Sequence, residues 1–256
     1  MNRTKIEWVQ NPDGTPGYTF NPITGCLNGC TYCYARKLAN WRLKSRYLAN
    51  LDIALPYEAP PNPFKDPFYP RFWQDKLDQP VNLKKPAGIF VCDMADLFGK
   101  AVPEQWTGSV MNFIEACPQH RFYLLTKQPQ NLAKWSPFPS NCWVGFSATD
   151  GPDLYRSLLP MMAVKATVKF VSFEPLLSDA THTKFGRLLP QVYGLGLLDW
   201  VIVGAQTKPV VMPKREWVDD IIQSCPPSKT RVFLKNSLKP LYPEGLRQEM
   251  PNCGEK

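Results

Sequence analysis

Residues 21–35, NPITGCLNGCTYCYA, crowd three thiols into eight positions of the chain: Cys26, Cys30 and Cys33. The apolar, β-branched stretch that leads into this segment, GYTFNPITGC, is typical of a strand. Gly25 and Gly29 allow the loop between the cysteines to adopt positive φ angles. The residues from Tyr34 to about Ala49 then have the spacing of an amphipathic helix. The segment therefore predicts a strand, a cysteine-bearing loop and a helix in succession.

A strand–helix alternation continues after residue 86. Apolar runs recur there at intervals of 22 to 33 residues, and their central positions are Ile89, Phe122, Val144, Phe170, Val201 and Val232. Continuous β-branched and aromatic runs suit parallel strands that are buried on both faces, and the intervals leave room for crossover helices. The sequence therefore predicts an α/β fold in a single domain over residues 1–256. We expect an open or partial (β/α) barrel of six or seven parallel strands.

Residues 51–86 do not follow this alternation. They hold eight prolines together with six aromatic residues. A disordered linker would be poor in aromatic side chains. We therefore expect an ordered, irregular insertion, which serves either as a lid over a site or as a strap that covers the core.

Composition and charge limit the classes of protein. The chain has 256 residues with 44% hydrophobic content, enough for a full core, and a net charge of +8 that permits an anionic partner such as nucleic acid. It has no apolar run long enough to span a membrane and no secretory signal, which predicts a cytoplasmic protein with reduced thiols. We expect the other cysteines to be small, buried residues: Cys92, Cys117, Cys142, Cys225 and Cys253.

The odd number of clustered cysteines bears on the kind of metal site. A structural zinc site usually has four ligands in two pairs, and no second pair is present. A redox pair at Cys30 and Cys33 would leave Cys26 without a role. Thiolates hold the irons of a [4Fe–4S] cluster, and three of them leave one iron open to another ligand. The count therefore favours a catalytic iron–sulfur site.

The spacing Cys-x3-Cys-x2-Cys, with Tyr32 before the last cysteine, resembles that of the radical S-adenosylmethionine (SAM) enzymes. The resemblance extends along the chain through TKIEW, NPITGC, CTYCYA, DMADLF, LTKQP, FEPLL and DWVIVGAQ, which are similar to blocks of a radical-SAM-like family of bacteria and phages. It implies that Cys26, Cys30 and Cys33 ligate a [4Fe–4S] cluster, that SAM binds the open iron, and that Tyr32 lies beside the adenine.

The same resemblance implies the chemistry. An electron from a flavodoxin- or ferredoxin-like donor would cleave SAM, and the resulting 5′-deoxyadenosyl radical would abstract hydrogen from an unknown substrate. The chain departs from the superfamily where CDMADLF replaces a Gly-Gly-Glu stretch. Asp93 or Asp96 would there accept a hydrogen bond from the SAM ammonium. At GAQ, Gln206 stands where the family has an acid.

Polar residues at the other strand ends complete the predicted site, because the carboxyl ends of parallel strands carry the functional residues of such folds. Glu174, Lys127 and Lys235 close apolar runs and are the candidate catalytic residues. A charged group at such a position needs a partner, which predicts an ion pair with Glu174 or a contact to an anion. Ser147 and Gln206 are further candidate cofactor contacts, and Asp150 or Ser147 would otherwise cap a helix.

A second class of function remains open. The chain could be a nucleic-acid-binding protein in which the cysteines hold a structural metal. Its basic helix carries Arg36, Lys37, Arg42, Lys44 and Arg46. In this hypothesis Trp73 or Phe72 would stack on a base, while we expect Trp41 to pack inward.

Overall fold

The computed structural model describes residues 1–54, 62–183, 186–187 and 197–252. Eight strands of these ranges form the mostly parallel sheet that runs through the α/β fold: β1 (Asn2–Arg3), β2 (Tyr18–Phe20), β5 (Gly88–Val91), β6 (Arg121–Thr126), β7 (Cys142–Ser147), β8 (Val168–Phe173), β11 (Trp200–Val203) and β14 (Arg231–Leu234). The helices are α1 (Tyr34–Asn40), α2 (Lys44–Ala49), α3 (Glu104–Glu115), α4 (Gly151–Met162) and α6 (Arg215–Ser224). The described residues also form three two-stranded antiparallel sheets: β3 (Ile23–Thr24) with β4 (Arg71–Phe72), β9 (His182–Thr183) with β10 (Gly186–Arg187), and β12 (Gln206–Thr207) with β13 (Val210–Val211).

The chain divides into two compact units. The first comprises Met1–Asn131 and Pro139–Cys142, and the second comprises Leu132–Phe138 and Trp143–Lys256. In the first unit β1 pairs antiparallel with β2, while β2, β5 and β6 are parallel neighbours. In the second unit β7, β8, β11 and β14 are all parallel neighbours.

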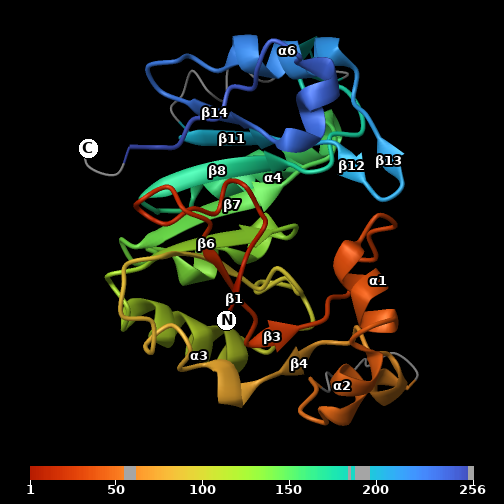
Figure 1. Ribbon diagram of the computed structural model, residues 1–256, viewed down its shortest axis with the longest axis vertical. Coiled ribbons are helices and arrows are strands. Elements are labelled where there is room, and N and C mark those ends of the chain that lie inside the picture. Colours follow the sequence, from red (N-terminus) through yellow and green to blue (C-terminus); the bar gives the residue numbers. More distant parts are fainter. Residues whose placement is uncertain (55–61, 184–185, 188–196, 253–256) are drawn as a thin grey trace. The chain divides into compact units, whose positions relative to one another are not determined.

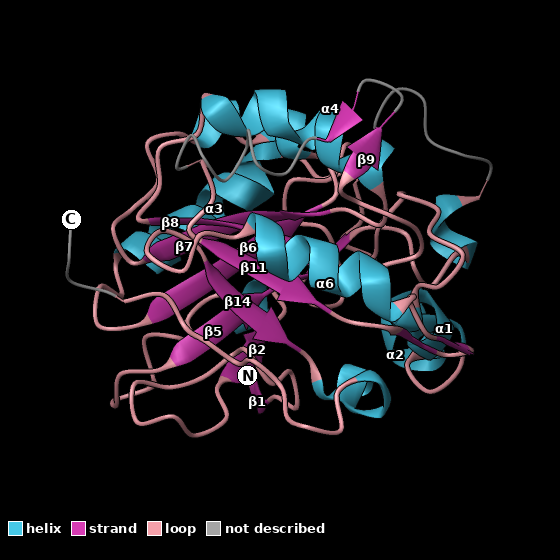
Figure 2. Ribbon diagram, turned by 90° about the horizontal axis from the view of Figure 1, so that it is seen from above, coloured by secondary structure: helices cyan, strands magenta, loops and turns pink. Residues whose placement is uncertain are grey.

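These strands confirm the alternation seen in the sequence. Seven strands have parallel neighbours, and each of the six expected central positions lies within one of them. Their apolar runs are buried because helices cover parallel sheets, and α6 runs beside β11 and β14 in the second unit (Figure 1 and Figure 2). The closure of the strands into a barrel and the organisation as one domain stay predictions.

The basic segment after the cysteines differs from the expected single helix. It forms two short helices, α1 and α2, and Trp41 between them has φ −119° and ψ −95°, outside the helical region. The Asn40 side chain donates to the Arg36 carbonyl at 2.8 Å and so competes for the end of the helix. The break lets Leu38, Leu43 and Tyr47 pack in one apolar cluster of the first unit.

The described part of the insertion is ordered, as expected, and it packs as a strap. Phe68 and Tyr69 are buried, and Arg71 is only 1% exposed. The Arg71 guanidinium donates to backbone carbonyls at the following positions: Asn50 at 3.1 Å, Asp66 at 2.8 Å, Tyr69 at 2.9 Å and Phe64 at 3.5 Å. A buried charge is tolerated there because its donors are satisfied by carbonyls that would otherwise lack partners. Part of the insertion lies outside the described residues, including Pro56, Tyr57, Pro60 and Pro61.

The isolated cysteines are buried as predicted at positions 92, 117, 142 and 225, and Cys253 lies outside the described residues. No helix in the described ranges is both long and apolar enough to cross a membrane.

Replacing Arg71 tests whether the strap depends on this guanidinium. Arg71→Met should lower the free energy of unfolding by about 3 kcal/mol, because buried carbonyls lose charge-assisted donors. Denaturant titration measures the loss. Lys65→Met, which removes an exposed cation from the same segment, should stay within about 0.5 kcal/mol of the unmodified protein. Equal stability of the two variants would contradict a structural role for Arg71.

Candidate functional site

The cysteine loop begins directly after β3, which pairs antiparallel with β4. Gly25 donates its amide to the Met94 carbonyl at 2.9 Å, and Cys26 donates to the Phe68 carbonyl at 3.0 Å. Gly25 has φ +90°, and a Cβ atom there would lie 2.4 Å from the Tyr69 carbonyl oxygen. Only glycine fits this position, so the loop is fixed between the end of β5 and the insertion.

The three thiols are all partly exposed. The Asn28 amide donates to Cys26 Sγ at 3.4 Å, and the Arg36 amide donates to Cys33 Sγ at 3.3 Å, where Cys33 is the N-cap of α1. Burial, with the charges of Asp96 and of the other two thiols, raises the pKa of the Cys26 thiol to about 12. A thiolate at Cys26 therefore needs a cation beside it.

The loop fits a thiolate-bound metal group in its donor chemistry. Two of its sulfurs already accept backbone N–H groups, which is how protein loops commonly stabilise ligated thiolates. In the arrangement that the structure describes, however, no three His, Cys, Asp or Glu side chains surround one point as ligands. Of the two histidines, His120 is buried, packs against Phe122 and contacts the Pro80 carbonyl at 3.0 Å, away from the thiols. The assignment of Cys26, Cys30 and Cys33 as ligands of a cluster therefore stays a prediction.

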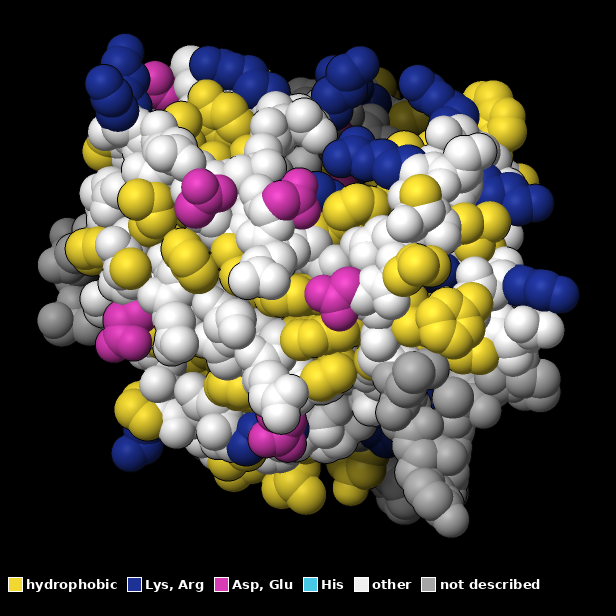
Figure 3. All heavy atoms as spheres, turned by 90° about the horizontal axis from the view of Figure 1, so that it is seen from below, with side chains coloured by type: hydrophobic (Ala, Val, Ile, Leu, Met, Phe, Trp, Pro, Cys, Tyr) yellow, Lys and Arg dark blue, Asp and Glu magenta, His cyan; other side chains and the backbone are white. Residues whose placement is uncertain are grey.

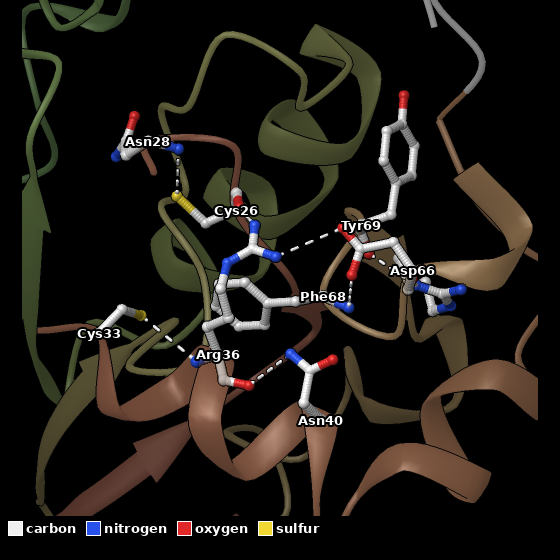
Figure 4. A network of polar contacts seen from close by, with 9 residues as sticks. Cys26, Asn28, Cys33, Arg36, Asn40, Asp66, Phe68 and Tyr69 are labelled. Carbon is white, nitrogen blue, oxygen red and sulfur yellow. Dashed lines mark hydrogen bonds and ion pairs between the residues drawn. The ribbon is translucent and has the colours of Figure 1, made fainter. Parts of the chain in front are cut away.

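Arg36 ties the cysteine loop to the insertion (Figure 4). Its guanidinium donates to the Cys26 carbonyl at 3.2 Å, pairs with Asp66 at 3.5 Å and lies 4.9 Å from the Phe68 ring centroid. Asp66 in turn accepts from the Phe68 amide at 2.8 Å. The strap therefore positions the loop through the Arg36 side chain, which contacts the Cys26 backbone and Asp66.

Asp96 holds the loop from the opposite direction. It is buried, and its carboxylate accepts four hydrogen bonds: from Asn28 Nδ2 at 2.9 Å, Thr126 Oγ1 at 2.7 Å, the Lys127 amide at 3.0 Å and the Phe98 amide at 3.2 Å. Gln128 also donates to the Asn28 side-chain oxygen. Because both Asp96 oxygens are engaged by the chain itself, the carboxylate acts first as an anchor between the loop and β6.

The Asp93 carboxylate accepts fewer hydrogen bonds from the chain than the Asp96 carboxylate does. It accepts from Asn21 Nδ2 at 2.5 Å and from the Tyr34 hydroxyl at 3.2 Å, and burial raises its pKa. Cys92 before it has φ +60°, in the left-handed region that residues other than glycine seldom adopt. This turn ends β5 and brings Asp93 beside α1. A carboxylate kept in a desolvated position is well placed to accept an ammonium group.

Tyr32 and Lys127 meet beside the thiols. The Lys127 ammonium donates to the Tyr32 hydroxyl at 3.1 Å and lies 5.3 Å from the ring centroid. The nearby phenol and the Cys30 thiol raise the pKa of Lys127 despite its burial, so the lysine stays charged. The first unit therefore has a fixed positive charge next to the cysteine loop.

The second unit has its own polar cluster at strand ends. Lys235, after β14, forms an ion pair with Glu174, after β8, as one of the expected alternatives for Glu174. Ser172 Oγ lies 3.3 Å from the second Glu174 oxygen. A Cβ atom at Gly204 would lie 3.0 Å from Lys235 Cδ and 3.1 Å from Glu174 Cγ, so glycine at the end of β11 leaves room for the pair.

The remaining candidates of this unit have local contacts. Ser147 ends β7 and is the register partner of Ser172, while Gln206 in β12 donates to the Pro209 carbonyl at 2.9 Å. Asp150, not Ser147, caps α4 by accepting from the Asp153 amide at 2.7 Å. Because the two clusters belong to different units, their convergence at one mouth stays a prediction.

Several residues of these clusters were not foreseen in the sequence: Asn21, Asn28, Thr126, Gln128, Ser172 and the inward role of Arg36. Their position next to a cysteine or at a strand end was the only signal for them.

Comparison with solved structures defines the class of fold. The complex of spore photoproduct lyase with dinucleoside spore photoproduct matches with a TM-score of 0.52 at 13% identity, over 85% of this chain and 76% of the lyase chain. A mutant of that lyase matches with a TM-score of 0.44 at 14% identity, over 90% of this chain and 65% of the other. A further mutant with bound AdoMet and dinucleoside spore photoproduct gives 0.39 at 12% identity, over 96% and 67%. The first of these matches shows a mostly parallel α/β fold shared with the lyase.

Residues 3–239 match the family described as Protein of unknown function (DUF5131). The match spans nearly the whole chain, so the chain belongs to this family. A search among curated proteins finds no match.

The raised pKa of Asp93 has a consequence for stability. In the unfolded chain this carboxyl has its ordinary pKa of 3.8, and in the folded protein the pKa is higher. The free energy of unfolding therefore falls as pH rises from the unfolded-state pKa of 3.8 to the higher pKa of the folded state, and it stays lower above that pH. Asp93→Asn should raise the unfolding free energy at neutral pH, and the gain should disappear below about pH 4. Denaturant titrations across pH measure this, with the exposed Asp52→Asn as control. A variant that is less stable at neutral pH would show that the carboxylate stabilises the fold.

Proposed function

We propose that this chain is a radical SAM enzyme with one [4Fe–4S] cluster. The observation that carries the proposal is a three-thiol loop fixed between a parallel strand and a helix, with Asp93 and Lys127 beside it. The likeness of the fold to spore photoproduct lyase, a radical SAM enzyme, supports the same conclusion.

A reduced cluster with SAM supplies one-electron cleavage of SAM to methionine and a 5′-deoxyadenosyl radical, which abstracts hydrogen from a substrate. In this proposal Cys26, Cys30 and Cys33 hold the cluster. Asp93 accepts the SAM ammonium, and the Lys127 cation pairs with the SAM carboxylate. Tyr32, fixed by Lys127, lies beside the adenine. A flavodoxin- or ferredoxin-like protein supplies the electron.

The remaining candidates have supporting roles in this proposal. Asp96 keeps the loop in place and so contributes to SAM binding through Asn28 and the Lys127 backbone. Glu174 and Lys235 form a preassembled ion pair that can orient a polar substrate or exchange a proton with it. Ser147 and Gln206 supply further polar contacts near that pair. The substrate itself is not identified by these residues.

The other class, a protein in which the cysteines hold a structural metal, makes a different prediction. Zinc in such a site would leave purified protein colourless, whereas an iron–sulfur cluster makes anaerobically purified protein brown.

Cysteine variants test the ligand assignment. Alanine at Cys26, Cys30 or Cys33 should abolish iron and sulfide binding after anaerobic reconstitution, because the cluster loses a thiolate. The buried Cys117→Ala and Cys225→Ala should retain about four irons per chain. Iron and sulfide analysis and the visible spectrum measure the outcome. A triple variant that still holds iron would show that the ligands lie elsewhere.

The activity has a direct test. With a strong reductant and SAM, reconstituted protein should form 5′-deoxyadenosine slowly even without substrate, as quantified by chromatography. Lys127→Gln should weaken SAM binding while it leaves the iron content unchanged, because the cation is removed and the thiols are not. Protein that holds the cluster and binds SAM but never cleaves it would disprove the catalytic assignment.

A further inference from the structure

The segment from Tyr34 to Leu51 is strongly basic. It holds five Lys or Arg residues and no Asp or Glu. Arg36 is turned inward to the Cys26 carbonyl and Asp66. The other four basic residues are exposed on α1, α2 and the turn between them: Lys37, Arg42, Lys44 and Arg46. On the face drawn in Figure 3, Lys and Arg side chains are most frequent along the upper and right-hand edges, and single Asp and Glu side chains are scattered over the face.

Trp41 stands among these cations and is 73% exposed. The expectation that it packs inward is wrong, because α1 ends at Asn40 and Leu38 and Leu43 take the places against the apolar cluster. The Arg42 guanidinium lies 5.7 Å from the Trp41 ring centroid. The exposed indole, with cations on either side of it in the sequence, is available to stack on a base.

The two aromatic residues first expected to stack on a base are engaged within the protein. Phe72 is buried and stacks on Trp106 with ring centroids 5.2 Å apart. Trp73 packs against Tyr47, donates to Thr24 and carries the Lys76 ammonium at 3.9 Å. Phe72 is therefore not available for stacking, and the Trp73 ring is already contacted by Tyr47 and two cations. Trp41 is the most exposed of the aromatic rings that the structure describes.

Lys76 adds a further cation beside Arg46. Arg46 lies 5.4 Å from the Trp73 ring that Lys76 also contacts. Burial, and next the Arg46 charge, lower the pKa of Lys76 to about 8, and the weaker influence of Asp75 does not offset them. An anion that settles beside Arg46 would relieve this repulsion.

We propose that the α1–α2 face, made of Lys37, Trp41, Arg42, Lys44 and Arg46, binds single-stranded nucleic acid. The cations neutralise backbone phosphates, and the Trp41 ring stacks on an unpaired base. An acidic protein partner fits less well, because the exposed rings of this segment, Trp41 and Tyr34, lie among four exposed cations, and protein interfaces need a larger apolar centre. Since Cys33 is the N-cap of α1, Trp41 lies about 12 Å along the helix axis from the last residue of the cysteine loop. The proposal goes beyond the radical chemistry and does not depend on it.

Fluorescence anisotropy with a short labelled oligothymidylate tests the proposal. Kd should rise steeply between about 50 mM and about 200 mM salt. Trp41→Ala should raise Kd about tenfold without changing the salt slope, and Trp41→Phe should restore most of the affinity. The double variant Arg42→Gln with Lys44→Gln should reduce the slope by about 1.4, because two single-strand phosphate contacts are lost.

Two controls distinguish binding by this face from nonspecific attraction of the oligonucleotide to a positively charged protein. The double variant Lys84→Gln with Lys85→Gln removes the same charge from exposed positions of the same unit and should leave the slope nearly unchanged. The iron-free cysteine variants should bind the oligonucleotide as the iron-loaded protein does, so a failed cluster assignment would leave this result intact. No binding at about 50 mM salt, equal effects of the two double variants, or an unchanged Kd in Trp41→Ala would each overturn the proposal. An acidic flavodoxin-like protein that binds this face while the oligonucleotide does not would also overturn it.

Discussion

The hydrogen bonds to the buried carboxylate of Asp96 are the interactions on which the position of the cysteine loop depends. It joins the loop through Asn28, the end of β6 through Thr126 and Lys127, and its own turn through Phe98. Hydrogen bonds to a charged group are worth about 1.5–3 kcal/mol each, and a buried carboxylate without them would be strongly unfavourable. The same carboxylate therefore stabilises the first unit and determines where the thiols lie.

A second support comes from the insertion. Arg71 gathers the carbonyls of the strap, and Arg36 links the strap to the loop through Asp66 and the Cys26 carbonyl. Phe68 completes the link, since its carbonyl accepts from Cys26. The two arginines thus have different roles: Arg71 holds the strap together, and Arg36 joins the strap to the backbone of the cysteine loop. A proline-rich segment that looks irregular in sequence is in this way part of the framework of the site.

The candidate site contains groups that lower the stability of the folded protein. Asp93 has a raised pKa because it is desolvated, Cys26 has a raised pKa for the same reason, and Cys92 holds a left-handed backbone conformation. Each of these features lowers the stability of the folded chain. Such costs concentrate at functional sites, where a bound cation or metal group offsets them. The exposed Trp41 ring is likewise unfavourable on the surface of the same unit, because a large apolar side chain stays in contact with water.

The sequence by itself determined the strand–helix alternation, the buried single cysteines and the thiol loop. Patterns of this kind are local, because burial on both faces of a strand requires a continuous apolar run. It also indicated that Glu174 needs a partner and left Lys127 and Lys235 as alternatives, since a charge that closes a buried strand needs compensation. The structure shows that the partner is Lys235. The sequence did not determine the break at Trp41, which depends on how Leu38, Leu43 and Tyr47 reach one cluster.

Tertiary structure alone decided which polar residues meet. Asp96 and Asn28 are 68 positions apart, and Tyr32 and Lys127 are 95 positions apart, so no local pattern could pair them. Tertiary structure also decided that Trp41, rather than Trp73, is the exposed ring. The physical reason is that hydrogen bonding and exposure depend on neighbours supplied by distant segments, whereas periodic burial depends on residues next to one another in the chain.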